Sequence, residues 1–100
     1  MAQTPIRVGI NGFGRIGRNF FRAVNAANAP IEIVAVNDLG SIKTMAHLLK
    51  YDSVLGILPN EIIPLEDGIS VDGKVLKVLQ FRDPKDLPWK SLGVDVVIES

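Results

Sequence analysis

Residues 8–17 of this chain, VGINGFGRIG, decide its fold. They begin inside an apolar run over residues 6–11, which has the pattern of a strand buried on both faces. The run leads directly into three glycines spaced as G-x-G-x-x-G. Apolar residues at helical spacing then predict a helix over residues 15–27. The glycines therefore occupy a tight turn between a strand and a helix.

The rest of the chain continues the alternation of strands and helices. Strands are expected at residues 31–36, 61–65 and 95–99, a helix at 42–49, a loop at 51–56, and a hairpin of 69–71 with 75–79 around Asp72-Gly73. A strand, helix and strand in succession predict parallel pairing. The expected fold class is α/β: a Rossmann-type, mostly parallel sheet, an incomplete doubly wound fold with a small β-hairpin insertion.

The inward faces of both helices follow from the same spacing. In the first helix the expected apolar stripe is Ile16, Phe20, Ala23, Val24 and Ala27, with Asn28 as its C-terminal cap. In the second helix the expected inward residues are Met45, Leu48 and Leu49.

The glycine turn has the chemistry of a dinucleotide site. Gly12 permits the tight turn, Gly14 leaves room for phosphates, and Gly17 lets the helix pack close to the strand. Backbone N–H groups at the start of the helix favour the anionic pyrophosphate. Asp38 lies 21 positions after Gly17, where an acid that binds the adenosine ribose is expected. Its charge would repel a 2′-phosphate, so NAD is favoured over NADP.

Composition excludes several other classes of function. Eleven basic and eleven acidic residues cancel, which gives no electrostatic case for nucleic acid. No apolar run approaches the ~20 residues of a membrane span, and no signal pattern precedes the first strand, so we expect a cytoplasmic protein. The chain has no cysteine and one histidine. We therefore expect neither catalytic nor metal-binding residues within it.

Other polar side chains receive structural interpretations. Arg15, Arg18 and Arg22 fall near one helix face, where a solvated surface is favoured over phosphate or RNA binding. His47 is interpreted as a packing or surface residue. Asp52 with Ser53 is interpreted as a pair that fixes a loop by hydrogen bonding, because no base accompanies it.

Several blocks of the sequence resemble phosphorylating glyceraldehyde-3-phosphate dehydrogenases. They are residues 8–18, Val36-Asn37-Asp38, residues 46–53, Arg82-Asp83-Pro84, Leu87-Pro88-Trp89 and residues 97–100. The resemblance covers residues 6–100, about the first third of a family member. It departs at Val54-Leu55-Gly56, where the family usually has histidine before the glycine. Erythrose-4-phosphate dehydrogenases share much of this region and remain an alternative.

The resemblance implies residue roles that composition alone does not give. Ile16 would pack near the nicotinamide, and Arg82 would lie by the adenine. The expected NAD-binding residues are Asn11, Gly12, Phe13, Gly14, Arg15, Ile16, Gly17, Asp38 and Arg82. In the family, a cysteine thiolate attacks the aldehyde, hydride passes to NAD in this glycolytic oxidation, and full-length members are homotetramers.

The expected organisation is one partial NAD(P)-binding domain over residues 1–100, without the catalytic domain. Such a fragment is expected to be inactive by itself. A stand-alone nucleotide-binding module and the cofactor subunit of a split dehydrogenase are the alternatives. Val96, Val97 and Ile98 are expected at an exposed sheet edge that invites self-association.

Overall fold

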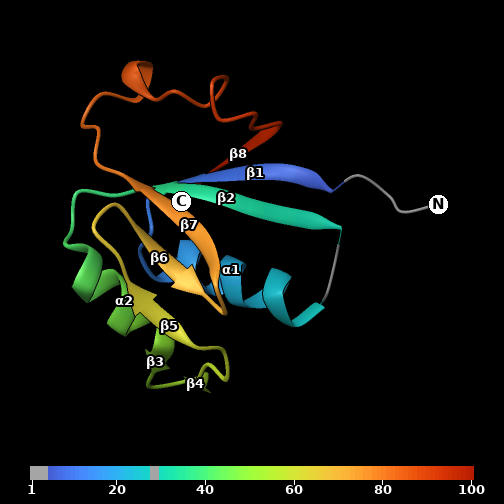
Figure 1. Ribbon diagram of the computed structural model, residues 1–100, viewed down its shortest axis with the longest axis vertical. Coiled ribbons are helices and arrows are strands. Elements are labelled where there is room, and N and C mark those ends of the chain that lie inside the picture. Colours follow the sequence, from blue (N-terminus) through green and yellow to red (C-terminus); the bar gives the residue numbers. More distant parts are fainter. Residues whose placement is uncertain (1–4, 28–29) are drawn as a thin grey trace.

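The main sheet contains six strands, and three of its five pairings are parallel (Figure 1). The computed structural model describes residues 5–27 and 30–100, so Asn28 lies outside the described residues. The elements are β1 (Ile6–Asn11), α1 (Arg15–Ala27), β2 (Ile31–Asn37), α2 (Ile42–Lys50), β3 (Tyr51–Asp52), β4 (Gly56–Ile57), β5 (Ile62–Pro64), β6 (Gly68–Val71), β7 (Lys74–Leu79), the 3-10 turn η1 (Pro84–Asp86) and β8 (Val96–Glu99). The strand order is β5-β6-β7-β2-β1-β8.

The parallel centre of the sheet confirms the expected α/β class. β1 pairs in parallel with both β2 and β8, and β2 pairs in parallel with β7. The expected hairpin forms at Asp72-Gly73, where both residues have positive φ, 52° and 86°. This turn type suits the twist of a two-residue hairpin. The hairpin is part of the main sheet rather than a separate insertion, because its second strand, β7, pairs in parallel with β2.

Strand β8 lies at one edge of the sheet, as expected. Its only strand neighbour among the described residues is β1, and Val96 is exposed. The opposite edge is β5, which pairs with β6 alone.

Residues 51–57 form a small hairpin, so the prediction of a loop there was wrong. β3 pairs with β4 through Tyr51 with Ile57 and Asp52 with Gly56. The Asp52 carboxylate closes the turn by accepting the N–H groups of Val54 and Leu55, at 2.8 and 2.7 Å. This bonding confirms that Asp52 fixes the local backbone, and it lets the flanking residues pair.

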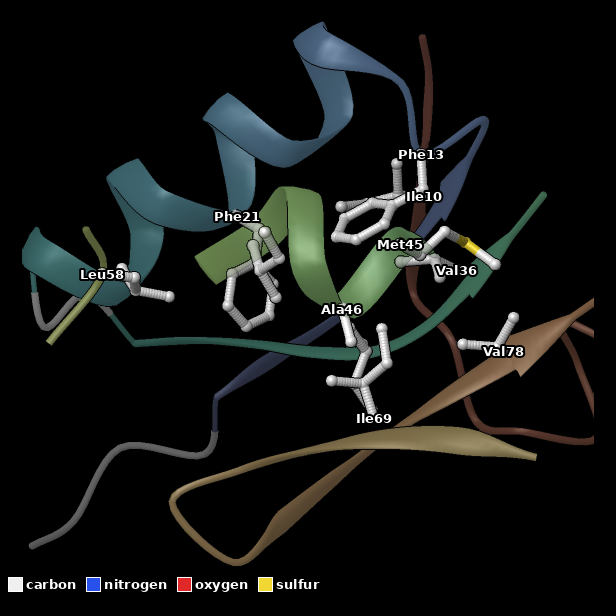
Figure 2. Packing of buried hydrophobic residues seen from close by; sticks show 11 residues of the cluster. Ile10, Phe13, Phe21, Val36, Met45, Ala46, Leu58, Ile69 and Val78 are labelled. Carbon is white, nitrogen blue, oxygen red and sulfur yellow. The ribbon is translucent and has the colours of Figure 1, made fainter. Parts of the chain in front are cut away.

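Both helices pack on the same face of the sheet, with the core between them (Figure 2). Phe13 and Phe21 meet edge to face in this layer, with their ring centroids 6.3 Å apart. The buried cluster consists of Ile10, Phe13, Phe21, Val36, Met45, Ala46, Leu49, Leu58, Ile69, Leu76 and Val78.

The buried faces of the helices differ in part from the predicted stripes. On α1 the fully buried residues are Gly17 and Phe21, with Phe20 packed beside them, whereas Ile16, Ala23 and Ala27 are exposed. The glycine at position 17 allows this side of the helix to press onto the sheet, which turns Ile16 outward. On α2, Met45 and Leu49 are buried as predicted, but Ala46 takes the place expected for Leu48.

The other face of the parallel centre is covered by the segment that leads to β8. Trp89, the single tryptophan of the chain, packs directly over Gly9 in β1. A Cβ atom added at Gly9 would lie 2.6 Å from Trp89 Cζ3, closer than real contacts allow. Gly9 therefore leaves the space that the indole ring fills.

We predict that Gly9→Ala displaces Trp89 and destabilises the chain by about 1–3 kcal/mol, the usual cost of overpacking. Tryptophan emission would shift to longer wavelength in the native state, and the urea midpoint would fall. Gly14→Ala is the matched control, because a Cβ there meets no atom within 4 Å among the described residues. Unchanged emission and midpoint in Gly9→Ala would contradict this packing.

Candidate functional site

The glycine turn joins β1 to α1 at the carboxyl end of the parallel strands. Gly12 has φ +95°, a conformation that side chains disfavour, and its N–H donates to Asn37 O at 2.7 Å. A Cβ on Gly17 would lie 2.5 Å from Gly12 O and 3.1 Å from Ile10 Cγ2. Above Gly14, in contrast, no atom of the described residues lies within 4 Å of a Cβ position. As expected, Gly12 thus forms the tight turn, Gly14 leaves open space, and Gly17 allows the helix to pack closely.

The first turn of α1 presents free hydrogen-bond donors. Within the part of the chain that the structure describes, the N–H groups of Gly14, Arg15 and Ile16 have no hydrogen-bond partner. No acidic residue occupies the first turn of the helix. The positive end of the helix dipole therefore meets no acidic side chain of the helix itself beside the open space at Gly14, which is the arrangement that holds phosphate groups.

Asp38 lies directly beside this turn. Its Oδ2 accepts the N–H of Phe13 at 2.9 Å, and its Oδ1 accepts the N–H of Gly40 at 2.9 Å. An ionised carboxylate offers about four acceptor sites. Two of them remain for a ligand after these bonds, so the residue fits both a structural role and ribose binding.

Phe13 supports the glycine turn from the core side. Its ring is 1% exposed and packs in the core, while its N–H is held by Asp38 and its carbonyl accepts Arg18 Nη1 at 3.2 Å. It therefore anchors the turn rather than presenting its side chain to a ligand. Ile16, which is 72% exposed, is the apolar side chain that the turn does present.

Polar side chains link the ends of the strands in a continuous chain. Asn11 donates to Glu99 Oε1 at 3.0 Å and accepts from Asn37 Nδ2 at 3.0 Å. Asn37 also bonds to both backbone groups of Phe81. Arg82 follows Phe81 and is exposed. Asn37 lies outside the predicted set of binding residues, and its adjacency to Asp38 was the signal available.

Arg18 and Arg22 bind within the protein, so the prediction of a solvated face was wrong for them, whereas Arg15 is exposed as predicted. Arg22 donates to three carbonyl oxygens, those of Leu49, Lys50 and Gly56, at 2.9–3.0 Å through Nη2. Arg15 pairs with Asp52 at 3.7 Å. The second helix and the 51–57 hairpin are thereby fastened to α1. His47 is exposed, as its interpretation as a surface residue predicts, and its ring contacts that of Tyr51 at an angle of 46° with the centroids 4.9 Å apart.

The pKa of Asp52 reflects this position. The N–H groups of Leu55 and Val54 hold the pKa of its carboxyl below the usual value of 3.8. The charges of Arg15 and Arg22 act in the same direction, against the effect of burial.

A groove of about 530 Å³ lies away from the glycine turn, at the amino ends of the strands. It is lined on α1 by Phe21 and Val24, on β2 by Ile31 and Ile33, and on β7 by Val75 and Leu76, among others. Ligands of open parallel sheets bind at the opposite, carboxyl ends of the strands. The groove is therefore separate from the candidate site.

Fold and site together define a dinucleotide-binding α/β domain. The chain order runs from β1 outward to β2 and β7 and then returns to β8 on the other side of β1. The glycine turn emerges at this reversal, where such domains bind their cofactor. The residues around it fit a dinucleotide, because the free N–H groups, the open space at Gly14 and the Asp38 carboxylate lie around the same turn.

Comparison with known proteins identifies the family. Residues 6–100 match the family model described as "Glyceraldehyde 3-phosphate dehydrogenase, NAD binding domain", and the chain belongs to this family, whose cofactor is NAD. Glyceraldehyde-3-phosphate dehydrogenase from Streptomyces coelicolor is 66% identical over 95% of this chain and 28% of its own length. The chloroplastic A form from Nicotiana tabacum is 50% identical over 99% of this chain and 26% of its own length. The chain thus spans about a quarter of these relatives. Among the described residues, no helix has the length and apolarity to cross a membrane.

We predict that the stabilising effect of Asp52 is lost in acid. A depressed native pKa stabilises the fold above the ordinary pKa of the group, and this contribution disappears as the pH falls through the native value. The thermal midpoint of Asp52→Asn, whose amide oxygen still accepts the turn N–H groups, would lie below that of the parent chain at pH 7. The two midpoints would converge as the pH falls below the ordinary value of 3.8 and through the depressed native pKa of Asp52.

Asp67→Asn is the matched control for this measurement. Asp67 is exposed, and its side chain has no hydrogen bond or ion pair among the described residues. Its midpoint difference from the parent chain would stay small at both pH values. A gap for Asp52→Asn that widened in acid would contradict the assignment.

Proposed function

We propose that this chain holds NAD across the glycine turn as the N-terminal cofactor-binding portion of a glyceraldehyde-3-phosphate dehydrogenase. The observation that carries the proposal is the set of unpartnered N–H groups of Gly14, Arg15 and Ile16 next to the open space above Gly14. A pyrophosphate requires such donors, and no side chain of the turn competes for them. The family match and the identity to relatives of that name support the assignment.

Each proposed binding residue has a distinct task. Gly12 and Gly17 shape the turn, Phe13 anchors it, and the N–H groups of Arg15 and Ile16 hold the pyrophosphate. Asp38 binds the adenosine ribose with the acceptor sites left free by Phe13 and Gly40. Asn11 supports the turn from the end of β1, Ile16 packs against the nicotinamide, and Arg82 lies by the adenine.

Asp38 also explains a preference for NAD over NADP. A 2′-phosphate on the ribose would meet the Asp38 carboxylate at the position where a hydroxyl donates to it. The two anions repel each other, and the chain places no arginine or lysine directly after Asp38 to compensate, since Leu39 and Gly40 follow.

The proposed reaction needs chemistry that these 100 residues do not contain. When bound, NAD supplies the hydride acceptor for oxidation of an aldehyde. This chain's residues bind and orient the cofactor, and the absence of any cysteine leaves no thiolate to attack the substrate. The relatives' names support glyceraldehyde 3-phosphate as the proposed substrate. Assembly as a homotetramer and a cytoplasmic location stay predictions.

We predict that Gly14→Val abolishes tight NAD binding without unfolding the chain. The valine side chain would fill the space above the turn and displace the pyrophosphate from two or more charge-assisted hydrogen bonds, each worth about 1.5 kcal/mol. Affinity for NAD by calorimetry would fall by about 100-fold. The free energy of unfolding would change by less than about 0.5 kcal/mol, because nothing occupies that space.

NADP serves as the second ligand in this calorimetric experiment. The parent chain would bind NADP more weakly than NAD. Asp38→Asn would narrow this difference in affinity, because it removes the negative charge that repels the 2′-phosphate. Undiminished NAD binding to Gly14→Val would overturn the proposed site.

We predict that the purified chain does not oxidise glyceraldehyde 3-phosphate. The measurement is NADH absorbance with substrate, NAD and inorganic phosphate all present. Substrate oxidation by the chain alone, abolished by Gly14→Val, would show that a group other than a cysteine performs the chemistry. That result would contradict the proposed division between cofactor binding and catalysis.

A further inference from the structure

Asn37, the last residue of β2, uses its whole amide to hold a segment that is distant in the sequence. Its Oδ1 accepts the N–H of Phe81 at 2.9 Å, and its Nδ2 donates to the Phe81 carbonyl at 3.0 Å. The same Nδ2 donates to Asn11 Oδ1 at 3.0 Å. Because Phe81 provides one donor and one acceptor, these bonds fix which end of the amide points to which group. The side chain is held in one orientation and is only 7% exposed as a residue.

These bonds extend the sheet beyond the end of β7. The last backbone bond between the two segments runs from Asp38 N to Leu79 O at 2.9 Å. Phe81 lies two residues further on and outside any strand, where the Asn37 amide takes the place of a neighbouring backbone. Gln80 contributes a parallel bond from its Nε2 to Gly40 O at 2.9 Å. Gln80 and Phe81 are therefore fastened along residues 37–40.

The two ends of this fastening adjoin the two residues proposed for the adenosine. Asn37 directly precedes Asp38, and Phe81 directly precedes Arg82. Asp38 is fixed independently by the N–H groups of Phe13 and Gly40. Arg82, in contrast, is exposed, and its side chain has no partner among the described residues. Its backbone position depends on what holds Phe81.

We infer that Asn37 is a positioning residue for the adenosine half of the site. It sets the position of Arg82 relative to Asp38 by holding the Phe81 backbone. Asn37 does not itself contact the ligand. The inference rests on the proposed function, because Arg82 and Asp38 form an adenosine site only if the chain binds a dinucleotide. The ligand class affected is any nucleotide that carries adenosine, with or without the nicotinamide.

The test measures binding of NAD and of AMP to the parent chain and to Asn37→Asp. Aspartate has the shape of asparagine but lacks both N–H donors, so it repels the Phe81 carbonyl and Asn11 Oδ1. Affinities for NAD and AMP would fall by the same factor, about tenfold. Asn25→Asp on α1 is the matched control: the same change removes an amide donor to Asn60, far from the carboxyl ends of the strands, and would leave both affinities unchanged.

A double-mutant cycle separates positioning from a general structural role. If Asn37 acts through Arg82, the variant that combines Asn37→Asp with Arg82→Ala binds AMP no more weakly than Arg82→Ala alone. Additive losses would overturn the inference. So would Asn37→Asp with a lowered thermal midpoint but AMP and NAD affinities within twofold of the parent chain, measured where both are folded.

If Asn37→Asp does not fold, Phe81→Pro tests the same hydrogen bonding by changing the partner residue, Phe81, instead of Asn37. It removes the N–H that Asn37 Oδ1 accepts, and Phe81 is 40% exposed. The same tenfold loss for AMP and NAD is expected, and unchanged binding would refute the role. Failure of the proposed function has a different signature, since the parent chain itself would then bind neither NAD nor AMP.

Discussion

The close approach of α1 to β1 is the constraint on which the rest of the site depends. Gly17 has no side chain, so the first turn of the helix packs directly against the Gly12 carbonyl and Ile10. Any larger residue would push the helix away and carry its free N–H groups with it. Phe13 then anchors the turn from the core side, and Asp38 holds it from the next strand. The donors at the start of α1 are therefore fixed by backbone packing rather than by side chains that reach over the surface.

Local pattern was sufficient to predict the elements that build this turn. The bounds of β1 and α1 agree with the predicted ranges, and Asp72-Gly73 forms the predicted hairpin. These features depend on neighbouring residues alone: apolar runs, glycine conformations and spacing. The acid at position 38 was found for the same reason, since its distance from the glycines is set by the length of one helix and one strand.

Features that depend on distant segments could not be predicted in this way. Ile16 follows helical spacing as a core residue would, yet the sheet receives Gly17 and Phe21 instead. Arg22 looks like a surface residue in sequence, but its partners lie 27–34 positions away. The bonds from Asn37 to Phe81 cross 44 positions. Helical periodicity does not specify which face the tertiary structure uses, and hydrogen bonds across such separations leave no spacing signal.

Most polar side chains at the carboxyl ends of the strands form hydrogen bonds with backbone groups. These bonds determine which donors and acceptors remain free for a ligand. Asn37 is saturated by its bonds to Phe81 and Asn11, whereas Asp38 retains acceptor sites after binding Phe13 and Gly40. The groups left unpaired are thus the ones that a dinucleotide requires: a carboxylate for hydroxyls and N–H donors for phosphates. Since the surrounding bonds already fix these groups in the free chain, binding needs little further ordering of the turn, and less of the interaction free energy is lost to conformational entropy.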